Sequence, residues 1–573
     1  MSDGVVIRGG TVFDGTGAPG RKQDLVVRKG TVSEESARPE DTVIDAHGCW
    51  VTPGFIDNHT HYDAELEVAP SLSESVRHGV TTVTMGSCGL GMSVGSAVDL
   101  ADMFCRVEGV PRSVVKPLFE RVKDWDGPSS YIRHLEHRPL GPNVAVLLGH
   151  STIRAHVMGL GRSLDPATRA SRRELTAMAG LLEEALDAGF LGLSINTLKW
   201  DKMDGQTYRS RPTPSTFAGW SEYRLLNRIL RARGRVLQGV PNISTKVNVL
   251  LFVLESMGVF RPSLKTAIIS MVDAKASRHA LRLVGPMAWF ANRFLNANLR
   301  FQSLPNVFDF WVDGIEVPVF EEFPAGTEAL HIQAPDERAR LLEDPDYRRR
   351  FRRQWASRFW GRAYHRDLSE ARIVDCPDPS LIGSSFAEVA RRRGQHAVDA
   401  LLDLVATFGR RLRWYTVLGN DRPAWLRWIV RHPAVQVGFS DAGAHLRNMA
   451  HYNFPLRLLR LVKETDPPFM SVERAVHRCT QEIADWLGID AGVIAPGRRA
   501  DIVVLDPRFI DERVDEIHEA EMEGFDGLRR LVRRNDRAVR AVLIRGRRAV
   551  ENGQPCPELG RRPDFGQVLK ADS

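Results

Sequence analysis

The middle of the sequence alternates short apolar runs, rich in β-branched residues, with longer amphipathic segments. One amphipathic segment is clear before residue 190, where apolar side chains recur at helical spacing at Leu175, Met178, Leu181, Leu182 and Leu186. This alternation is typical of parallel βα units. We interpret eight runs as strands: residues 54–57, 80–84, 144–148, 191–195, 267–270, 299–301, 413–417 and 435–439. They predict the α/β fold class and a (β/α)8 TIM barrel.

The two ends of the chain have a different pattern, with short apolar strands separated by turns. If the ends pair with each other, they form one small β-sandwich domain beside the barrel. We therefore expect three parts: residues 1–52 and 486–573 in the sandwich, and residues 53–485 in the barrel. Residues 201–266 and 303–400 are long for connections, and are predicted to be helical insertions over the barrel mouth.

Composition and charge exclude several classes of protein. The 573 residues are 43% hydrophobic and 26% charged, as in an ordinary globular protein. The net charge of +7 is small for this length, so we predict no nucleic-acid partner. No segment has the apolar length of a membrane-spanning helix or of a signal-peptide core, which predicts no membrane partner. Six cysteines without a CxxC pair favour a reducing cytoplasm over a disulfide framework.

Two histidines end the first apolar strand after the N-terminal sheet, in the segment Gly54-Phe55-Ile56-Asp57-Asn58-His59-Thr60-His61. Residues i and i+2 of a strand lie on the same side, so His59 and His61 can present two imidazoles to one metal ion. The carboxyl ends of the strands are where TIM barrels place their active sites. The position of this pair therefore predicts a metal site.

Three further segments complete a recognisable set of motifs: residues 78–89, which contain Cys88, residues 149–154, and residues 437–445, which contain Asp441. With the His59 segment, they resemble the amidohydrolase superfamily in its D-aminoacylase branch, the N-acyl-D-amino-acid deacylases. Residues 492–506 are similar to the superfamily's return into the β-sandwich. The resemblance covers nearly the whole chain apart from the two predicted insertions.

The resemblance implies a metal-dependent hydrolase of amide bonds and assigns the metal ligands. In that branch Cys88 would be a ligand together with His59, His61 and Asp441, and Asp441 would also take the proton of the attacking water. Histidine and thiolate ligands suit zinc, so we expect Zn²⁺, with one ion per chain favoured. A carboxylate near the metal can accept that proton and pass it to the leaving nitrogen, which makes Asp441 the expected catalytic residue.

The sequence also departs from the branch, which supplies two further histidine ligands from the fifth and sixth strands. At the runs counted as fifth and sixth, no histidine is found, and Asp273 and Gln302 are the candidate oxygen donors there. Many amidohydrolases bridge two metals with a carboxylated lysine after the fourth strand, but Lys199 is too far from the strand end to fit.

The substrate implied by the resemblance is a small N-acyl compound, such as an N-acyl amino acid, whose carboxylate needs a cation. His150, Arg154 and His445 are the predicted substrate-binding residues, and Arg154 can bind a carboxylate through two hydrogen bonds. Lys199 and Arg447 compete with Arg154 for this role. The sequence leaves open the acyl group, the amino acid, the stereochemistry and the oligomeric state.

Two other functions remain open at this point. A cyclic-amide hydrolase of the hydantoinase or dihydroorotase kind would keep His59 and His61 but normally needs the bridging lysine. A barrel without metal that serves as a binding protein draws support from the two missing histidines. The joint presence of His59, His61, Cys88 and Asp441 favours an enzyme over this second alternative.

Overall fold

The structure is a computed structural model that describes residues 4–242, 246–357 and 362–571. The outermost residues of the two predicted sandwich segments, 1–3 and 572–573, lie outside this range. At the centre is an eight-stranded parallel sheet, with strand order β17-β13-β12-β11-β10-β9-β8-β6. Its strands are β6 (Phe55–Asp57), β8 (Val80–Met85), β9 (Asn143–Gly149), β10 (Gly192–Asn196), β11 (Val236–Val240), β12 (Lys265–Ile269), β13 (Asn298–Ser303) and β17 (Val435–Val437).

The sheet closes into a barrel through short continuations of its two edge strands. β7 (His59–Thr60) follows β6, β18 (Phe439–Ala442) follows β17, and β7 and β18 pair in parallel. Beside them, the backbone N–H of Asn58 donates to the carbonyl of Gly438 at 2.6 Å. The fold class is therefore the predicted TIM barrel, and the carboxyl ends of its first and eighth strands lie side by side.

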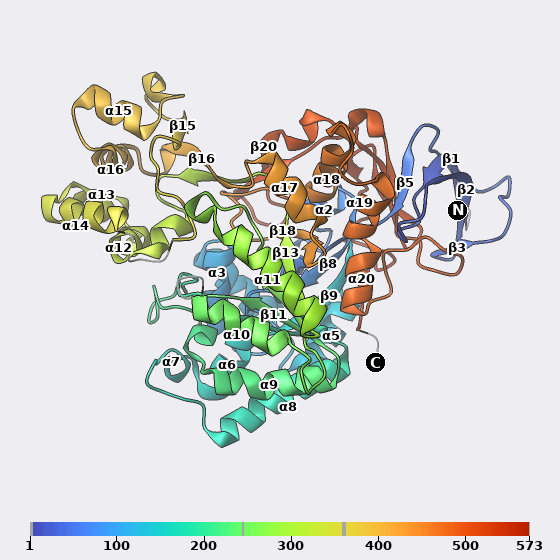
Figure 1. The fold of residues 1–573 in the computed structure, drawn as a ribbon, viewed down its shortest axis with the longest axis horizontal. Coiled ribbons are helices and arrows are strands. Elements are labelled where there is room, and N and C mark those ends of the chain that lie inside the picture. Colours follow the sequence, from blue (N-terminus) through green and yellow to red (C-terminus); the bar gives the residue numbers. More distant parts are fainter. Residues whose placement is uncertain (1–3, 243–245, 358–361, 572–573) are drawn as a thin grey trace.

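Helices surround the barrel sheet on its outside (Figure 1). α8 begins with a capping box between Ser171 and Glu174 and ends at Gly189, whose φ of 103° favours glycine. Its buried face includes Met178, which belongs to the apolar pattern that predicted this helix. The helices between strands and after the last one are α1 (Glu65–Val68), α2 (Ser73–Val76), α3 (Ala97–Glu108), α4 (Arg112–Val122), α5 (Pro128–His137), α6 (His150–Met158), α7 (Leu160–Ser163), α8 (Arg172–Ala188), α9 (Trp220–Ala232), α10 (Lys246–Ser256), α11 (Ala280–Phe294), α17 (Pro423–Arg431), α18 (Phe454–Glu464), α19 (Val472–Cys479) and α20 (Gln481–Leu487).

The fifth barrel strand corrects the interpretation of residues 201–266 as a helical insertion. β11 lies inside this segment and pairs in parallel with β10 and β12, between helices α9 and α10. Its sequence, Val-Leu-Gln-Gly-Val, is interrupted by Gln238 and Gly239, which hides the apolar run. A side chain at Gly239 would lie 2.1 Å from the ring of Phe252 on α10, so this glycine allows the helix to pack closely.

The prediction that residues 413–417 form a barrel strand was also wrong: the residues form a strand, but in another sheet. β16 (Arg413–Gly419) pairs antiparallel with β14 (Phe308–Asp313) and β15 (Arg372–Asp375), in a three-stranded sheet outside the barrel. An apolar run shows that a strand is buried but does not show which sheet it joins. The segment between β13 and α17 is thus a mixed α/β insertion, whereas the sequence predicted helices alone.

This insertion has its own hydrophobic core and projects from the barrel at the upper left of Figure 1. Phe320, Phe351 and Trp355 contribute rings to that core. The first part of the insertion runs past the barrel, because Arg106 on α3 donates to Glu321 at 2.6 Å. Its helices are α12 (Pro324–His331), α13 (Pro335–Glu343), α14 (Pro345–Ala356), α15 (Phe386–Arg393) and α16 (Ala397–Phe408).

Both ends of the chain enter one nine-stranded sheet beside the barrel, at the right of Figure 1. β19 pairs with β5 on one side and with β22 on the other, which joins the N-terminal strands to the C-terminal ones. β20 (Ile517–Glu521) and β21 (Arg529–Arg533) form a separate hairpin. The sheet consists of β1 (Gly4–Val12), β2 (Arg21–Arg28), β3 (Thr31–Ser33), β4 (Thr42–Asp45), β5 (Trp50–Pro53), β19 (Ile502–Leu505), β22 (Val539–Ile544), β23 (Arg547–Glu551) and β24 (Gln554–Pro555).

The C-terminal segment also touches the barrel directly. The hairpin lies against it, because Arg530 forms an ion pair with Glu65 at 2.7 Å, and Val568 bridges to Val144 of β9. The division at residues 52 and 485 stays our proposal for the domain limits. Within the described residues, no helix is both long enough and apolar enough to cross a bilayer.

Candidate metal centre

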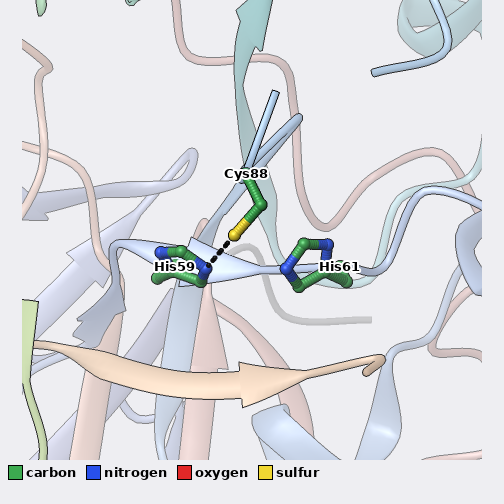
Figure 2. A group of neighbouring side chains, drawn as sticks. All are labelled: His59, His61 and Cys88. Carbon is green, nitrogen blue, oxygen red and sulfur yellow. Dashed lines mark hydrogen bonds between the residues drawn. The ribbon is translucent and has the colours of Figure 1, made fainter. Parts of the chain in front are cut away.

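His59, His61 and Cys88 converge at the carboxyl ends of the first two barrel strands (Figure 2). One potential ligand atom from each residue lies within 4.8 Å of the others. His59 Nε2 and Cys88 Sγ are 3.3 Å apart, and the two imidazole rings meet at an angle of 65°. All three side chains are buried. The structure therefore brings together three of the four residues that the motifs predicted as ligands.

The loop after β8 turns sharply to direct the thiol at the histidines. Gly86 has a φ of 77°, and a side chain there would lie 2.1 Å from the carbonyl oxygen of Leu147. Cys88 itself has a φ of 55°, in the left-handed region. Its backbone N–H donates to Gln238 Oε1 at 3.0 Å, which holds the turn. Gln238, which interrupts the apolar run of β11, therefore helps to shape this site.

Asp441 is the fourth predicted ligand, and it faces the two histidines from β18. Its Oδ1 atom lies 3.6 Å from His59 Nε2 and 3.5 Å from His61 Nε2. The following turn approaches β7 closely, because a side chain at Gly443 would lie 2.3 Å from the carbonyl oxygen of His61. The pairing of β7 with β18 therefore brings together residues far apart in the sequence.

Gln302 fixes the ring of His59. Its Oε1 lies 2.8 Å from His59 Nδ1, and its Nε2 donates to the carbonyl of Asn58 at 2.8 Å. Because the amide nitrogen is committed to Asn58, Oε1 accepts from Nδ1–H, and the lone pair of His59 then lies on Nε2. That is the atom directed at Cys88 and Asp441. The expected oxygen donor Gln302 thus contacts a histidine ligand instead of the ligand cluster.

Three of the distances between these atoms, all measured from a histidine, match a tetrahedral zinc site, although Asp441 does not belong to the group whose ligand atoms all lie within 4.8 Å of one another. With usual zinc bond lengths, ligand atoms on neighbouring corners lie roughly 3.3–3.6 Å apart. The measured separations are 3.3 Å from His59 Nε2 to Cys88 Sγ and 3.5–3.6 Å from Asp441 Oδ1 to the two histidines. Two imidazoles, a thiol and a carboxylate are a donor set that zinc accepts. The residues present therefore fit this metal.

Burial shifts the protonation of the whole cluster toward neutral forms. It lowers the pKa of His59 to about 4 and raises the pKa of the Cys88 thiol well above its usual range. Burial also raises the pKa of Asp441 to about 7, with a further contribution from the charge of Asp201. A cation at the centre would oppose these effects, since it stabilises thiolate and carboxylate.

Sequence reasoning missed two groups that interact electrostatically with Asp441. Asp201, in the loop after β10, is close enough for its charge to raise the pKa of Asp441, and burial raises its own pKa to about 6. Tyr364 comes from the insertion, and its pKa is raised by burial and by nearby carboxylates that include Asp201 and Asp441. Asp201 follows a predicted strand, which was an available signal. No sequence pattern marks Tyr364.

His150 and Arg154 are placed behind the site, on α6. Both are fully buried; Glu222 forms an ion pair with Arg154, and its carboxylate lies 3.0 Å from His150 Nε2. His150 Nδ1 is also 3.0 Å from Ser215 Oγ. The guanidinium of Arg154 is therefore already bound by a carboxylate of the protein and does not reach solvent. This contradicts its expected role as the anchor for a substrate carboxylate.

The remaining predicted residues divide by position. His445 is half-buried and close to the centre: burial lowers the pKa of His61, and the charges of His59 and then His445 lower it further. Arg447 is bound by Asp313 at 2.9 Å and by Glu519 at 3.0 Å. Lys199 is exposed. Asp273, the other expected oxygen donor, is buried in ion pairs with Arg278 and Arg422.

The corrected strand order changes which residues end the fifth and sixth strands. β11 is followed by Pro241 and Asn242, and β12 is followed by Ser270 and Met271. Neither of these strand ends carries a histidine. The departure from the D-aminoacylase pattern therefore persists after the strands are counted correctly.

Known proteins that are similar to this chain include amidohydrolases and N-acyl-D-amino-acid deacylases. The model of the amidohydrolase family matches residues 42–220. An uncharacterized protein of Mycobacterium tuberculosis is 46% identical over 99% of this chain and 94% of its own length. The N-acyl-D-glutamate deacylase of Alcaligenes xylosoxydans xylosoxydans is 28% identical over 89% of this chain and 88% of its own length. The crystal structure of N-acyl-D-glutamate deacylase from Bordetella bronchiseptica, complexed with zinc and a phosphonate inhibitor, aligns over 99% of both chains with a TM-score of 0.62 and 24% identity.

Barrel, buried ligand cluster and relatives together define a hydrolase that acts on carbon–nitrogen bonds other than peptide bonds. Residues 42–220 match the amidohydrolase family, and along most of its length the chain is similar to N-acyl-D-amino-acid deacylases.

Proposed function

We propose that the protein deacylates an N-acyl-D-amino acid or a related N-acyl compound, with one zinc ion held by His59, His61, Cys88 and Asp441. The observation that carries this proposal is that His59 Nε2 lies 3.3 Å from Cys88 Sγ and 3.6 Å from Asp441 Oδ1, separations that suit neighbouring zinc ligands. The D configuration is taken from the names of the deacylases that the chain is similar to.

Asp441 is the proposed acid–base residue. A zinc ion at this centre would supply Lewis-acid chemistry, polarising the scissile carbonyl and activating water. Asp441 accepts the proton of the attacking water on its carboxylate and delivers it to the nitrogen that leaves with the amino acid. His59 is kept in the ligand tautomer by Gln302, so the cluster is preorganised before substrate arrives. The buried setting excludes competing bulk water.

To bind a free carboxylate on the substrate, the site needs a Lys or Arg side chain that is not already held in a close ion pair with a carboxylate of the protein. Arg154 and Arg447 are held by carboxylates, and Lys199 is exposed. Lys202, next to Asp201 in the loop after β10, is the alternative that we favour. Its Nζ is 3.9 Å from Glu321 and 3.4 Å from Thr327 Oγ1, so its partners are distant and a substrate carboxylate can compete with them. His445 stays a proposed substrate-binding residue near the centre.

Lys202→Met tests this assignment. We expect KM to rise for N-acyl amino acids and to change much less for the matching amides, which lack the carboxylate. Arg154→Met is the comparison: it removes a buried charge behind the site, so any loss of activity should be the same for acids and amides. An equal effect of Lys202→Met on acids and amides would reject Lys202 as the anchor.

Two measurements test the proposed function itself. Elemental analysis of the purified protein should find close to one zinc per chain, and a panel of N-acetyl-D- and N-acetyl-L-amino acids should be hydrolysed with a preference for the D series. Activity confined to cyclic ureides would move the protein to the cyclic-amide hydrolases, a function that the exposed position of Lys199 disfavours. Loaded zinc without hydrolysis of any compound would support a binding protein instead.

A further inference from the structure

The outside of the barrel carries an apolar surface over α10, α11 and the loop after α10. Eight of the eleven exposed large hydrophobic residues in the described part of the chain lie within residues 250–294. We call these eight residues the α10–α11 face: Leu250, Leu254, Val259, Phe260, Leu283, Trp289, Phe290 and Phe294. Singly exposed apolar residues are normal, but such a concentration on one surface marks an interaction site.

The α10–α11 face is one continuous surface. Helices α10 and α11 both pack against strand β13 and lie near each other in Figure 1. The N–H of Gly258 donates to the carbonyl of Leu295 at 3.2 Å, which holds the loop that carries Phe260 against the end of α11. On α11, the ring of Phe294 lies 5.7 Å from Trp289 and 5.1 Å from Phe290. Three aromatic rings thus form one cluster.

The exposed charges on this part of the chain are positive. Residues 220–298 contain only three carboxylates, and all are buried: Glu222, Glu255 and Asp273. The α10–α11 face is bordered by exposed arginines that form no ion pair within the described residues, and Arg293 lies over the ring of Phe294 at 5.5 Å. These three arginines are Arg261, Arg282 and Arg293.

We propose, in place of the absence of a membrane partner expected from the sequence, that the α10–α11 face docks on the surface of an anionic phospholipid bilayer without spanning it. Aromatic and leucine side chains bordered by arginines are the chemistry of interfacial helices, whose rings enter the headgroup region while guanidinium groups contact phosphates. A second copy of this chain is a poorer occupant, because a two-fold contact through the same face brings arginines against arginines without a carboxylate to separate them.

The position of the α10–α11 face leaves the metal centre free. The loop that carries Phe260 leads into the amino end of β12, whereas His59, Cys88 and Asp441 lie at the carboxyl ends of their strands. Phe260 and Phe294, which precede the amino ends of β12 and β13, therefore lie toward the end of the barrel opposite its mouth, and the other residues of the face lie along the outer wall. Docking would hold the enzyme at a bilayer while its site stays open to substrate.

Co-sedimentation of the full chain with vesicles tests the proposal. We expect binding to phosphatidylcholine vesicles that contain phosphatidylglycerol, little binding to pure phosphatidylcholine, and weaker binding at high salt. The triple variant Trp289→Ser, Phe290→Ser and Phe294→Ser should lower the partition coefficient by at least about tenfold. A second triple variant, Arg261→Glu, Arg282→Glu and Arg293→Glu, should lower it by a similar factor of about ten or more.

Matched controls use exposed residues elsewhere. Ile382→Ser with Val43→Ser removes apolar surface outside the α10–α11 face, and both variants should bind vesicles as the unaltered protein does. The charge control is a triple substitution to Glu on the insertion, with the same change in net charge: Arg349, Arg353 and Arg391. Circular dichroism checks that each variant is folded.

Three results would overturn the proposal. The first is the absence of binding to anionic vesicles, and the second is equal loss of binding in the charge control. The third is a dimer that forms without lipid, disappears in the aromatic triple variant and does not bind vesicles, because the occupant of the face would then be a second copy.

Discussion

Gln302 offers the sharpest test of how the metal centre is built. Replacing it by leucine removes the acceptor for His59 Nδ1–H and the donor to the carbonyl of Asn58, which are both at 2.8 Å in a fully buried setting. Without the acceptor, the ring of His59 loses its preferred tautomer and orientation. Residues in this supporting position typically change metal affinity by about ten- to hundredfold, or about 1.4–2.7 kcal/mol. The free energy of unfolding of the metal-free protein should also fall by about 1–3 kcal/mol.

The assay is a competition titration of zinc against a chromophoric chelator, with the affinity compared between Gln302→Leu and the unaltered protein. Gln302→Glu keeps an acceptor for Nδ1–H and should retain most of the affinity. The control is Ser303→Ala on the same strand, which removes a buried hydrogen bond to the carbonyl of Met271 at 2.7 Å without touching a histidine. An affinity for Gln302→Leu within twofold of the unaltered protein would refute the argument. Equal losses in Ser303→Ala would also refute it.

Three further predictions follow from the same contacts. Asp441→Asn should lower turnover by about two to four orders of magnitude while the protein stays folded, measured as kcat beside a thermal unfolding curve; near-normal turnover would remove Asp441 from the mechanism. Glu222→Gln leaves the charge of Arg154 buried without a compensating carboxylate, and should reduce the free energy of unfolding by about 3–5 kcal/mol, measured by urea titration. A loss below about 1 kcal/mol would contradict this reasoning. Prolonged chelation should abolish activity, and stoichiometric zinc should restore it; activity that survives in a sample shown to be metal-free would exclude the metal centre.

The barrel was predictable because most of its strands are uninterrupted apolar runs. β9 and β10 are buried along their whole length, and their sequences show it. β11 was missed because Gln238 and Gly239 serve the site and the packing of α10, so the strand lacks the usual pattern. β16 was misplaced because burial within an insertion produces the same periodicity as burial within a barrel.

The proposed metal ligands could be picked out from the sequence because each of them stands in a local motif at a strand end. The residues that contact these ligands could not be identified from the sequence. Gln302 reaches His59 across 243 positions, and Glu222 takes up Arg154 across 68 positions, through tertiary contacts that no motif encodes. Arg154 therefore fitted the motif and the chemistry of a carboxylate anchor. Its burial and its ion pair with Glu222 argue against this role.

The contacts of Glu222 give the third-strand motif a structural role in the site. Glu222 pairs with His150, and His150 Nδ1 lies 3.0 Å from Ser215 Oγ. The same hydroxyl accepts from the backbone N–H of Asn196 at 3.0 Å, and the amide of Asn196 donates to Asp201. A buried chain of polar contacts thus connects α6 to the carboxylate that faces Asp441. In such a network, one member can set the position of the next, so we propose that His150 acts on the site through the placement of Asp201 instead of through contact with substrate.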